Sequence, residues 1–336
     1  MITISGGRLR PESSSVRRTT IMKTLIFGST GYVGRHVTAR LAADGHQVTS
    51  YIRSASAIPG IETLGAKAVI GDLDDLSALP AIVAEQDAVI WIAQLMHDGE
   101  RRVITALLDM LRGTNKTLIF TGGTSLLSIR TDGDWDERSF AETDEFTPRR
   151  QVAPRLEVER LVQASAADGV RGICIRPPLI WGNGGARYIA DMYHSVQATG
   201  AVCYVGRGLN LYSNVHVEDL ADVYARALER GVAGALYHAV SGELNNRMMA
   251  EAIARHLGVP ARSVTVEEAI GIWDKFTGPI VFSACSRTRC PRTREELGWA
   301  PHPDRLDILV DCVNPAYKAE MEAGRSNPAW VKAPAA

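Results

Sequence analysis

The chain has 336 residues, of which 46% are hydrophobic and 22% charged, so it is long and apolar enough to bury a full globular core. Its 37 basic residues nearly balance its 38 acidic residues, which leaves a formal net charge of -1. A chain so close to neutral has no positive field that would hold a polyanion, and this argues against a nucleic-acid-binding protein.

The apolar runs are too short for a membrane protein. The longest, Ala88–Ala93, is far below the ~20 apolar residues that a bilayer span needs. The N-terminus also lacks the apolar core and small-residue cleavage site of a signal peptide. The five cysteines form no CxxC pair and stand beside no histidine cluster, which favours reduced thiols over disulfides or a metal site. We therefore expect a cytoplasmic protein without a metal ion or a membrane partner.

Strand and helix patterns alternate from Met22 onward. Before it, residues 1–21 are rich in arginine and serine, and we predict that they form a disordered extension. Strands are predicted at 24–27, 48–52, 68–70, 88–93 and 117–120, and helices at 32–44, 76–84 and 101–111. Strands separated by helices of this length are typical of right-handed βαβ units, so the sequence predicts an α/β fold with a doubly wound parallel sheet.

A glycine-rich turn lies between the first predicted strand and the first predicted helix. Gly28 permits a tight turn, Gly31 lets backbone N–H groups approach a pyrophosphate, and Gly34 lets the helix pack on the sheet. The N-terminus of the helix adds partial positive charge. This strand–turn–helix context predicts a dinucleotide site. Its residues are Gly28, Ser29, Thr30, Gly31, Tyr32, Val33 and Gly34.

The residue after the second predicted strand indicates which dinucleotide is bound. An NAD-specific fold places Asp or Glu there to hold the ribose 2′-hydroxyl, but this chain has Arg53. Arginine is a permanently charged donor that pairs with a 2′-phosphate, so we expect NADP(H) as the preferred cofactor and NAD(H) as the alternative. A solvated arginine at a strand end is the other interpretation.

Gly71, Asp72 and Leu73 follow the third predicted strand. At this spacing we expect Asp72 to accept a hydrogen bond from the adenine amino group and Leu73 to pack on the adenine ring. Asp72 also suits the N-cap of a helix beginning near Asp74, and the two roles are compatible because a cap uses one carboxylate oxygen.

These motifs together resemble the short-chain dehydrogenase/reductase superfamily, in its extended and atypical branch of NAD(P)-dependent epimerase/dehydratase type. The resemblance runs from Met22 to about Pro301 and includes four further segments: 71–73, 176–182, 215–221 and 296–301. It implies a Rossmann domain with about seven parallel strands and a small C-terminal substrate domain. It also implies that 176–182, with Pro178, borders the nicotinamide, and that His216 is a packed structural histidine.

The resemblance also suggests a division of the chain. Residues 22–175 would be mainly the Rossmann dinucleotide-binding domain. Residues 176–315 would be mainly the substrate-binding part, with interleaved Rossmann elements, because this half is rich in the proline and glycine of contact-forming loops. Residues 316–336 would be a C-terminal tail.

The family's Tyr-x-x-x-Lys pair is absent from the helix predicted around residues 151–160. Anchoring on Leu156 and Glu159 places Gln151 at the tyrosine position and Arg155 at the lysine position. Glutamine neither gives nor takes a proton near neutral pH, so Gln151 cannot be the acid/base group. Arg155 can still hydrogen-bond the ribose of the cofactor but cannot relay a proton.

Other residues are therefore candidates for the proton donor. His97 follows the fourth predicted strand, in a loop that we expect to face the nicotinamide. The fifth strand is followed by Gly122 and Gly123, where the family usually has a substrate-positioning serine, and Thr124 or Ser125 is the candidate that would replace it. Tyr193, with its neighbours Tyr188 and His194, follows the segment expected to line the substrate pocket. We take His97, Ser125 and Tyr193 as the catalytic candidates, each weighed against a packing or surface role.

Three functions remain in competition. The first is an NAD(P)-dependent oxidoreductase that acts on a small carbonyl, imine or related substrate with a non-standard acid/base residue. The second is a non-catalytic NAD(P)-binding redox sensor or regulator, which the loss of the Tyr/Lys pair favours. A sugar-nucleotide epimerase or dehydratase is third, because that chemistry depends most on the tyrosine. We place the oxidoreductase first, with a small-molecule substrate and a homodimer as the expected partners.

Overall fold

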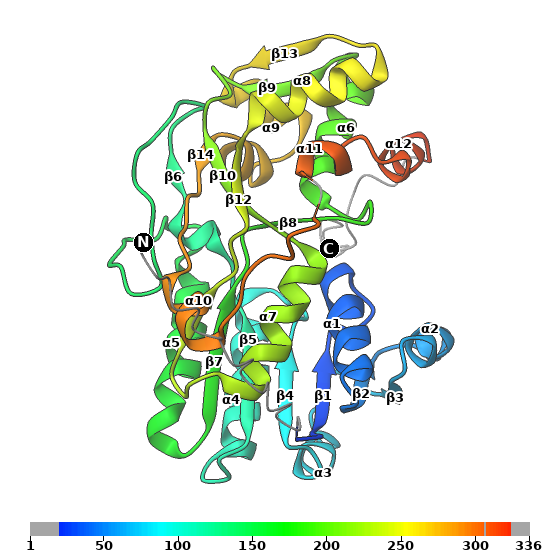
Figure 1. The fold of residues 1–336 in the computed structure, drawn as a ribbon, viewed down its shortest axis with the longest axis vertical. Helices are drawn as coiled ribbons and strands as arrows, with labels where there is room; N and C mark the ends of the chain where they lie inside the picture. The colour runs from blue at the N-terminus through cyan, green and yellow to red at the C-terminus, as the bar shows by residue number, and fades with distance from the viewer. Residues whose placement is uncertain (1–19, 306, 324–336) are drawn as a thin grey trace, which may run out of the picture.

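A parallel seven-stranded sheet forms the centre of the molecule, in the spatial order β3-β2-β1-β4-β5-β7-β11 (Figure 1). The structure is a computed structural model that describes residues 20–305 and 307–323, so the predicted N-terminal extension lies almost entirely outside the described residues. The strands are β1 (Lys23–Phe27), β2 (Gln47–Ile52), β3 (Lys67–Ile70), β4 (Ala88–Trp91), β5 (Thr117–Thr121), β7 (Arg171–Arg176) and β11 (Leu236–His238). This topology confirms the predicted α/β Rossmann fold.

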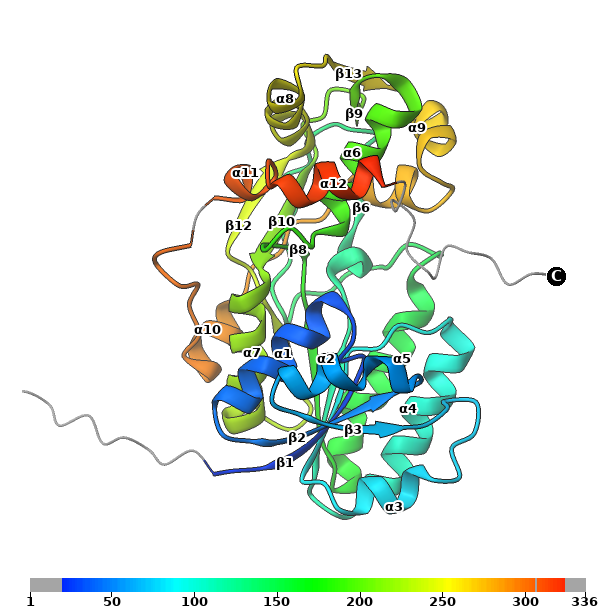
Figure 2. The same ribbon diagram turned by 90° about the vertical axis from the view of Figure 1, so that its right-hand side faces the viewer.

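Helices cover both faces of the sheet (Figure 2). On one face lie α1 (Tyr32–Ala43) and α7 (Val217–Arg230), and on the other α3 (Leu79–Ala84), α4 (His97–Leu111) and α5 (Ala153–Ala164). Alternate residues of the strands point to the two faces, so Ile26 packs in the α1/α7 core while Leu25 packs in the α3/α4/α5 core. The short α2 (Ile58–Thr63) connects β2 to β3.

The chain order reverses between β1 and β4. From β1 the sheet grows through β2 to β3 on one side, and through β4 to β5, β7 and β11 on the other. In open α/β sheets such a switch point is where ligands bind, in the crevice outside the carboxyl ends of the strands.

A second lobe, built from the C-terminal half, stands above this edge of the sheet (Figure 1). It contains the sheet β12-β10-β8, the pair β13-β9 and a separate apolar core around α6. Its strands are β8 (Leu179–Trp181), β9 (Val202–Val205), β10 (Leu211–His216), β12 (Gly242–Asn245) and β13 (Ala261–Val264), while β14 (Ala284–Cys285) pairs with β6 (Ile129–Arg130). Its helices are α6 (Arg187–Thr199), α8 (Asn246–Leu257), α9 (Val266–Ile272), α11 (Ile308–Asp311) and α12 (Pro315–Glu322), whereas α10 (Pro291–Leu297) packs on α7.

Three helices begin at positions that differ from the predictions. Helix α3 begins at Leu79, so the predicted start near residue 76 and the N-cap role of Asp72 are wrong. Helix α4 begins at His97, so His97 is not in a loop. Helix α5 begins at Ala153, which leaves Gln151 in the exposed turn before it. In α3 and α5 a proline stands in the first helical turn, where its missing N–H costs nothing.

The predicted C-terminal tail is also wrong where it can be tested. Residues 315–322 form α12, whose first turn contains Pro315 and whose N-cap is Asn314. Tyr317 of this helix is buried against Tyr193 of α6, with ring centroids 5.8 Å apart. Helix α12 therefore packs on the core of the second lobe.

The expectations of no membrane span and no metal site can be compared with the described residues. No helix among them is long and apolar enough to cross a bilayer. All five cysteines are buried and free, and the described part of the chain has no cluster of three or more His, Cys, Asp or Glu side chains that would suit a metal ion.

Candidate cofactor and substrate site

The turn between β1 and α1 needs two of its glycines for steric reasons within the chain. Gly28 has φ +95°, and a Cβ on it would lie 2.6 Å from the backbone nitrogen of Ala93. A Cβ on Gly34 would overlap the carbonyl oxygen of Gly28. The close approach of β1, α1 and the loop after β4 therefore requires glycine at both positions.

Gly31 is different, because the fold itself does not require glycine there. Its backbone is ordinary, with φ −78° and ψ 170°, and an added Cβ would meet only the Gly28 carbonyl oxygen, at 3.3 Å. Gly31 is the N-cap of α1, and this helix has no side-chain cap and no acidic residue in its first turn. The N–H groups at this helix end are thus left for an external anion. This is the arrangement that the phosphates of a dinucleotide require.

The other residues of the turn are placed by the fold, so any contact they make with a cofactor would come mainly from their backbone. Ser29 is buried and donates its hydroxyl to the carbonyl oxygen of Ile26, at 3.3 Å. Val33 packs against the α1/α7 core, and Thr30 is exposed. Tyr32 donates its hydroxyl to the carbonyl oxygen of Gly182, at 2.6 Å, and so ties the turn to the second lobe.

Arg53 and Asp72 stand at neighbouring strand ends. Arg53 is exposed directly after β2, and no acidic side chain pairs with it among the residues that the structure describes. Asp72 is exposed after β3 and accepts a hydrogen bond from the backbone N–H of Asp74, at 2.9 Å, which occupies one of its oxygens. Leu73 is half-buried against the α3/α4/α5 core. The two charged groups are therefore exposed at the carboxyl ends of β2 and β3.

Arg155 lies at the carboxyl ends of β4 and β5. Its Nη2 donates to the carbonyl oxygen of Thr121, at 3.3 Å, and its Nε lies 3.6 Å from Oε2 of Glu100 in α4. Glu100 in turn accepts a hydrogen bond from Nε1 of Trp91, at 3.2 Å. The side chain of Arg155 is 23% exposed, so part of its guanidinium faces the crevice. Arg155 therefore carries a partly exposed positive charge at the carboxyl ends of β4 and β5.

A second buried ion pair follows on the same helix. Glu159 of α5 pairs with Arg176 at the end of β7, at 2.5 Å, and both side chains are almost fully buried. Burial raises the pKa of Glu159, although the charge of Arg176 opposes the rise. A Cβ on Gly122 would overlap Oε1 of Glu159. The glycine at this position, where the family is expected to have a serine, is thus required by the carboxylate behind it.

The structure separates the three candidate proton donors. Tyr193 is fully buried in the core of the second lobe, and its hydroxyl donates to the carbonyl oxygen of Cys312, at 2.9 Å. Burial raises the pKa of Tyr193. This placement in the core, rather than at a pocket wall, corrects the expected position of Tyr193. His97 is half-buried as the first residue of α4.

Ser125 lies just beyond the carboxyl end of β5. It lies in the short helix η2 (Thr124–Leu127) that follows β5 and is half-exposed, and its hydroxyl has no hydrogen-bond partner among the described residues. Its neighbour Thr124 is buried and receives a hydrogen bond from Ser286 on its carbonyl oxygen, at 2.9 Å. Pro178 is buried between β7 and β8, next to Pro177, whose carbonyl accepts from the Thr124 N–H.

His216 is a structural residue, as predicted. Its Nδ1 accepts a hydrogen bond from the N–H of Glu218 and so caps α7, and its ring lies edge-on to Trp181 with centroids 4.8 Å apart. Burial lowers the pKa of His216, which favours the neutral ring that an accepting cap needs.

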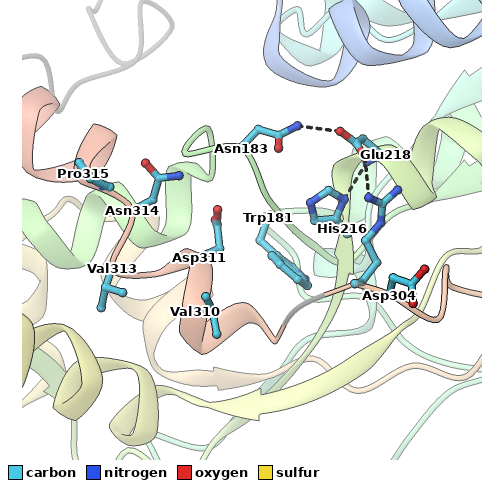
Figure 3. A pocket seen from close by; sticks show the side chains of 11 residues that line it. Trp181, Asn183, His216, Glu218, Asp304, Val310, Asp311, Val313, Asn314 and Pro315 are labelled. Atoms are coloured by element: carbon cyan, nitrogen blue, oxygen red, sulfur yellow. Dashed lines mark hydrogen bonds and ion pairs between the residues drawn. The ribbon is translucent and has the colours of Figure 1, made fainter.

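His216 and Trp181 border a cavity of about 450 Å³ between α7, α11 and the loop after β8 (Figure 3). Its other lining residues are Asn183, Glu218, Asp304, Arg305, Val310, Asp311, Val313, Asn314 and Pro315. Glu218 accepts a hydrogen bond from Nδ2 of Asn183, at 3.1 Å (Figure 3). Its other carboxylate oxygen pairs with Nη1 of Arg305, at 2.6 Å. Asp311 accepts from the Gly182 N–H and from the Tyr317 hydroxyl. The principal charges of this cavity are thus satisfied within the chain, and the open donors lie at the sheet edge instead.

The sequence reasoning missed Glu100 entirely. It is the acidic member of a buried set that also contains Trp91, Thr121 and Arg155, and these come from four different elements. An acid in the first turn of a helix is usually read as a favourable interaction with the helix dipole, so no local signal marked it.

Comparison with known proteins agrees with this geometry. Residues 24–241 match the model of the "NAD dependent epimerase/dehydratase family". The chain belongs to that family. The match confirms the predicted family and the predicted class of NAD(P)-dependent oxidoreductase enzymes.

Two relatives and one solved structure illustrate how similar this chain is to known proteins. An uncharacterized protein of Schizosaccharomyces pombe is 31% identical over 310 residues, which cover 88% of this chain and all of the relative. A 4-hydroxy-2-methyl-3-oxo-4-farnesyl-3,4-dihydroquinoline-1-oxide ketoreductase of Stigmatella aurantiaca is 24% identical and covers 66% of this chain and 69% of its own. The crystal structure of dTDP-glucose 4,6-dehydratase from Bacillus anthracis with NAD has the same fold, with a TM-score of 0.70 over 90% of this chain and 98% of that chain at 16% identity.

Proposed function

We propose that this protein is an NADP(H)-preferring reductase of a small carbonyl, imine or related substrate, and that it works without the family's tyrosine. The observation that carries the cofactor preference is Arg53, an exposed arginine without an acidic partner among the described residues, directly after β2. A carboxylate at this position would repel a 2′-phosphate, whereas a guanidinium attracts it by charge and by paired hydrogen bonds.

The substrate class rests on two supports. The ketoreductase of Stigmatella aurantiaca and a 2-alkyl-3-oxoalkanoate reductase of Stenotrophomonas maltophilia are both named for the reduction of a carbonyl group. The half-exposed hydroxyl of Ser125, at the carboxyl end of β5, is free to hydrogen-bond a carbonyl oxygen. Sugar-nucleotide chemistry is disfavoured because residue 151 is glutamine, in an exposed turn outside α5.

In this proposal, different residues of the chain bind the cofactor, orient the substrate and deliver the proton. The bound nicotinamide would supply the hydride. The helix end at Gly31 would hold the phosphates, Arg53 the 2′-phosphate and Arg155 the ribose. Together these contacts would bring the nicotinamide to the carboxyl end of β5. Ser125 orients the carbonyl oxygen, and the half-buried His97 at the start of α4 is the side chain we assign to proton delivery.

The test is a titration of NADPH and NADH followed by tryptophan fluorescence, with the wild type and with Arg53→Asp. We expect the wild type to bind NADPH at least ~10-fold more tightly than NADH, because a charge-assisted contact contributes about 1.5–3 kcal/mol. Arg53→Asp should abolish this preference. A wild type that prefers NADH contradicts the cofactor assignment, and one that binds neither contradicts the whole proposal.

Turnover separates the reductase from a non-catalytic sensor, which the glutamine at residue 151 also favours. NADPH oxidation is followed with an activated vicinal diketone as the probe substrate, for the wild type and for Ser125→Ala and His97→Gln. Turnover that falls in the variants, with unchanged NADPH affinity, supports the reductase. Tight NADPH binding with no turnover of diketones, 3-oxoesters or cyclic imines supports the sensor.

A further inference from the structure

Glu100 is a buried carboxylate of α4 that lies beside Arg155. Its side chain is 2% exposed, although it stands only one turn inside α4. Trp91 occupies Oε1 through a hydrogen bond, and Oε2 faces Nε of Arg155 at 3.6 Å. An isolated carboxylate at such a depth would be strongly destabilising, so its burial depends on the guanidinium beside it.

Arg155 lies between two buried acids. It interacts electrostatically with Glu159 as well as with Glu100, but the ion-pair partner of Glu159 is Arg176. Glu100 is therefore the acid that fixes Arg155 from the side of α4, while the carbonyl oxygen of Thr121 fixes it from β5. Nε of Arg155 is buried and has no hydrogen-bond partner among the described residues, so its orientation depends on the charge of Glu100.

We propose that Glu100 is a positioning residue for cofactor binding: it holds the Arg155 guanidinium in the conformation that binds the nicotinamide ribose. This inference rests on the proposed function, because it assumes that Arg155 touches that ribose. The guanidinium keeps donors on its exposed side after its contacts with Glu100 and Thr121, and these are the donors that a ribose diol needs. An arginine held in place beforehand loses less rotamer freedom on binding, which increases affinity.

A second ion pair between α4 and α5 provides a matched control. Arg101 of α4 pairs with Glu157 of α5 at 3.5 Å, and both side chains are exposed, at 61% and 62%. In the sequence, Arg101 is adjacent to Glu100, and Glu157 is two positions after Arg155. Glu157→Gln therefore removes an ion pair between α4 and α5 without touching the crevice, and it reports any effect due to helix packing alone.

The experiment compares two ligands. NADPH carries the nicotinamide ribose, whereas adenosine 2′,5′-bisphosphate carries only the 2′-phosphate half and serves as the internal reference. Dissociation constants are measured for the wild type, Glu100→Gln, Arg155→Ala, the double variant and Glu157→Gln. Glutamine at residue 100 retains an acceptor for Trp91 and removes only the charge.

We expect Glu100→Gln to weaken NADPH binding about 3- to 10-fold and Arg155→Ala about 10-fold or more, with the affinity for adenosine 2′,5′-bisphosphate unchanged. The double variant should match Arg155→Ala, because Glu100 acts through Arg155. Glu157→Gln should match the wild type for both ligands. If Glu100→Gln does not fold, Glu100→Asp withdraws the carboxylate by one methylene and tests the same point.

Each alternative result overturns the inference in an identifiable way. If Glu100→Gln weakens both ligands equally, its role is general packing. If it still weakens NADPH binding in the Arg155→Ala background, it does not act through Arg155. A wild type that binds neither NADPH nor NADH overturns the proposed function instead, whereas tight NADPH binding that is insensitive to both substitutions overturns the positioning role alone.

Discussion

The carboxylate of Glu159 occupies the space that a side chain on residue 122 would need. A Cβ built on Gly122 would overlap Oε1 of Glu159 and lie 3.3 Å from Cγ of Arg176. Glu159 is fully buried and its Oε2 is paired with Arg176, so a displacement of its carboxylate would disturb that pair. The absence of a serine at this position is therefore coupled to the buried ion pair.

Gly122→Ser should destabilise the protein by about 1–3 kcal/mol, because overpacking forces buried groups out of their preferred geometry. The measurement is the free energy of unfolding by chemical denaturation. Gly123→Ser is the matched control: the backbone there is extended, and a Cβ would meet only Oγ of Ser125, at 3.8 Å. Equal stability of the two variants would show that Glu159 does not restrict residue 122.

Substitution by alanine should have different effects at two glycines of the β1–α1 turn: at Gly31 it should weaken cofactor binding, and at Gly34 it should lower stability. Gly31→Ala should change the free energy of unfolding by less than about 0.5 kcal/mol, because an added Cβ is tolerated by the chain. It should weaken NADPH binding at least ~10-fold, because in the proposed function the phosphates bind at this helix end. Gly34→Ala should destabilise the fold, since overlap with the Gly28 carbonyl outweighs the ~1 kcal/mol that alanine gains in a helix. Denaturation and cofactor titration of both variants test this. A loss of stability in Gly31→Ala would contradict it.

Tyr193 and Ser125 should separate a structural role from a functional one. Tyr193→Phe removes the hydrogen bond to Cys312, so stability should fall by about 1 kcal/mol while turnover of the diketone probe stays at the wild-type level. Ser125→Ala should leave stability and NADPH affinity unchanged and lower turnover at least ~10-fold. Unfolding curves and steady-state rates are measured for both. If Tyr193→Phe stops turnover with its fold intact, the assignment to the core of the second lobe is contradicted.

Asp191 should make stability depend on pH. Burial raises its pKa from 3.8 to about 7, although the ion pair with Arg187 opposes the rise. A raised carboxyl pKa means that the folded protein binds the proton more tightly than the unfolded chain does. Its contribution to stability is therefore present below 3.8 and is lost as the pH rises to about 7, by up to about 1.4 kcal/mol per pH unit.

The check is to compare the free energy of unfolding of the wild type with that of Asp191→Asn across this pH range. The amide mimics the protonated acid, so the wild type should lose stability relative to the variant as the pH rises toward 7. A constant difference across the range would mean that Asp191 is not protonated in the folded state near neutral pH.

Local motifs were read correctly from the sequence because their partners are neighbours in the chain. The turn at residues 28–34 largely specifies its own conformation, since Gly34 packs against the backbone of Gly28 and Ser29. The starts of α3 and α5 were misplaced, and α12 was not predicted, because prolines were overlooked as markers of a first helical turn: Pro80, Pro154 and Pro315. Here the sequence contained the signal.

Contacts between distant elements could not be read in this way. Glu100 and Arg155 are far apart in the sequence and meet only because α4 and α5 pack on the same face of the sheet. Tyr193 has the same local pattern as a pocket-lining residue, but residues from several elements of the second lobe, Tyr317 of α12 among them, bury it. Neither relationship has a spacing or composition that marks it in advance.

By itself, the sequence determined the parallel α/β fold, the dinucleotide turn and the loss of the tyrosine, because periodicity, glycine spacing and side-chain chemistry are properties of short segments. The tertiary structure decided which charges are buried together, which candidate acids reach the crevice, and why residue 122 is glycine. Those features depend on side chains from separate elements competing for the same space, and that competition exists only once the sheet, its helices and the second lobe have packed.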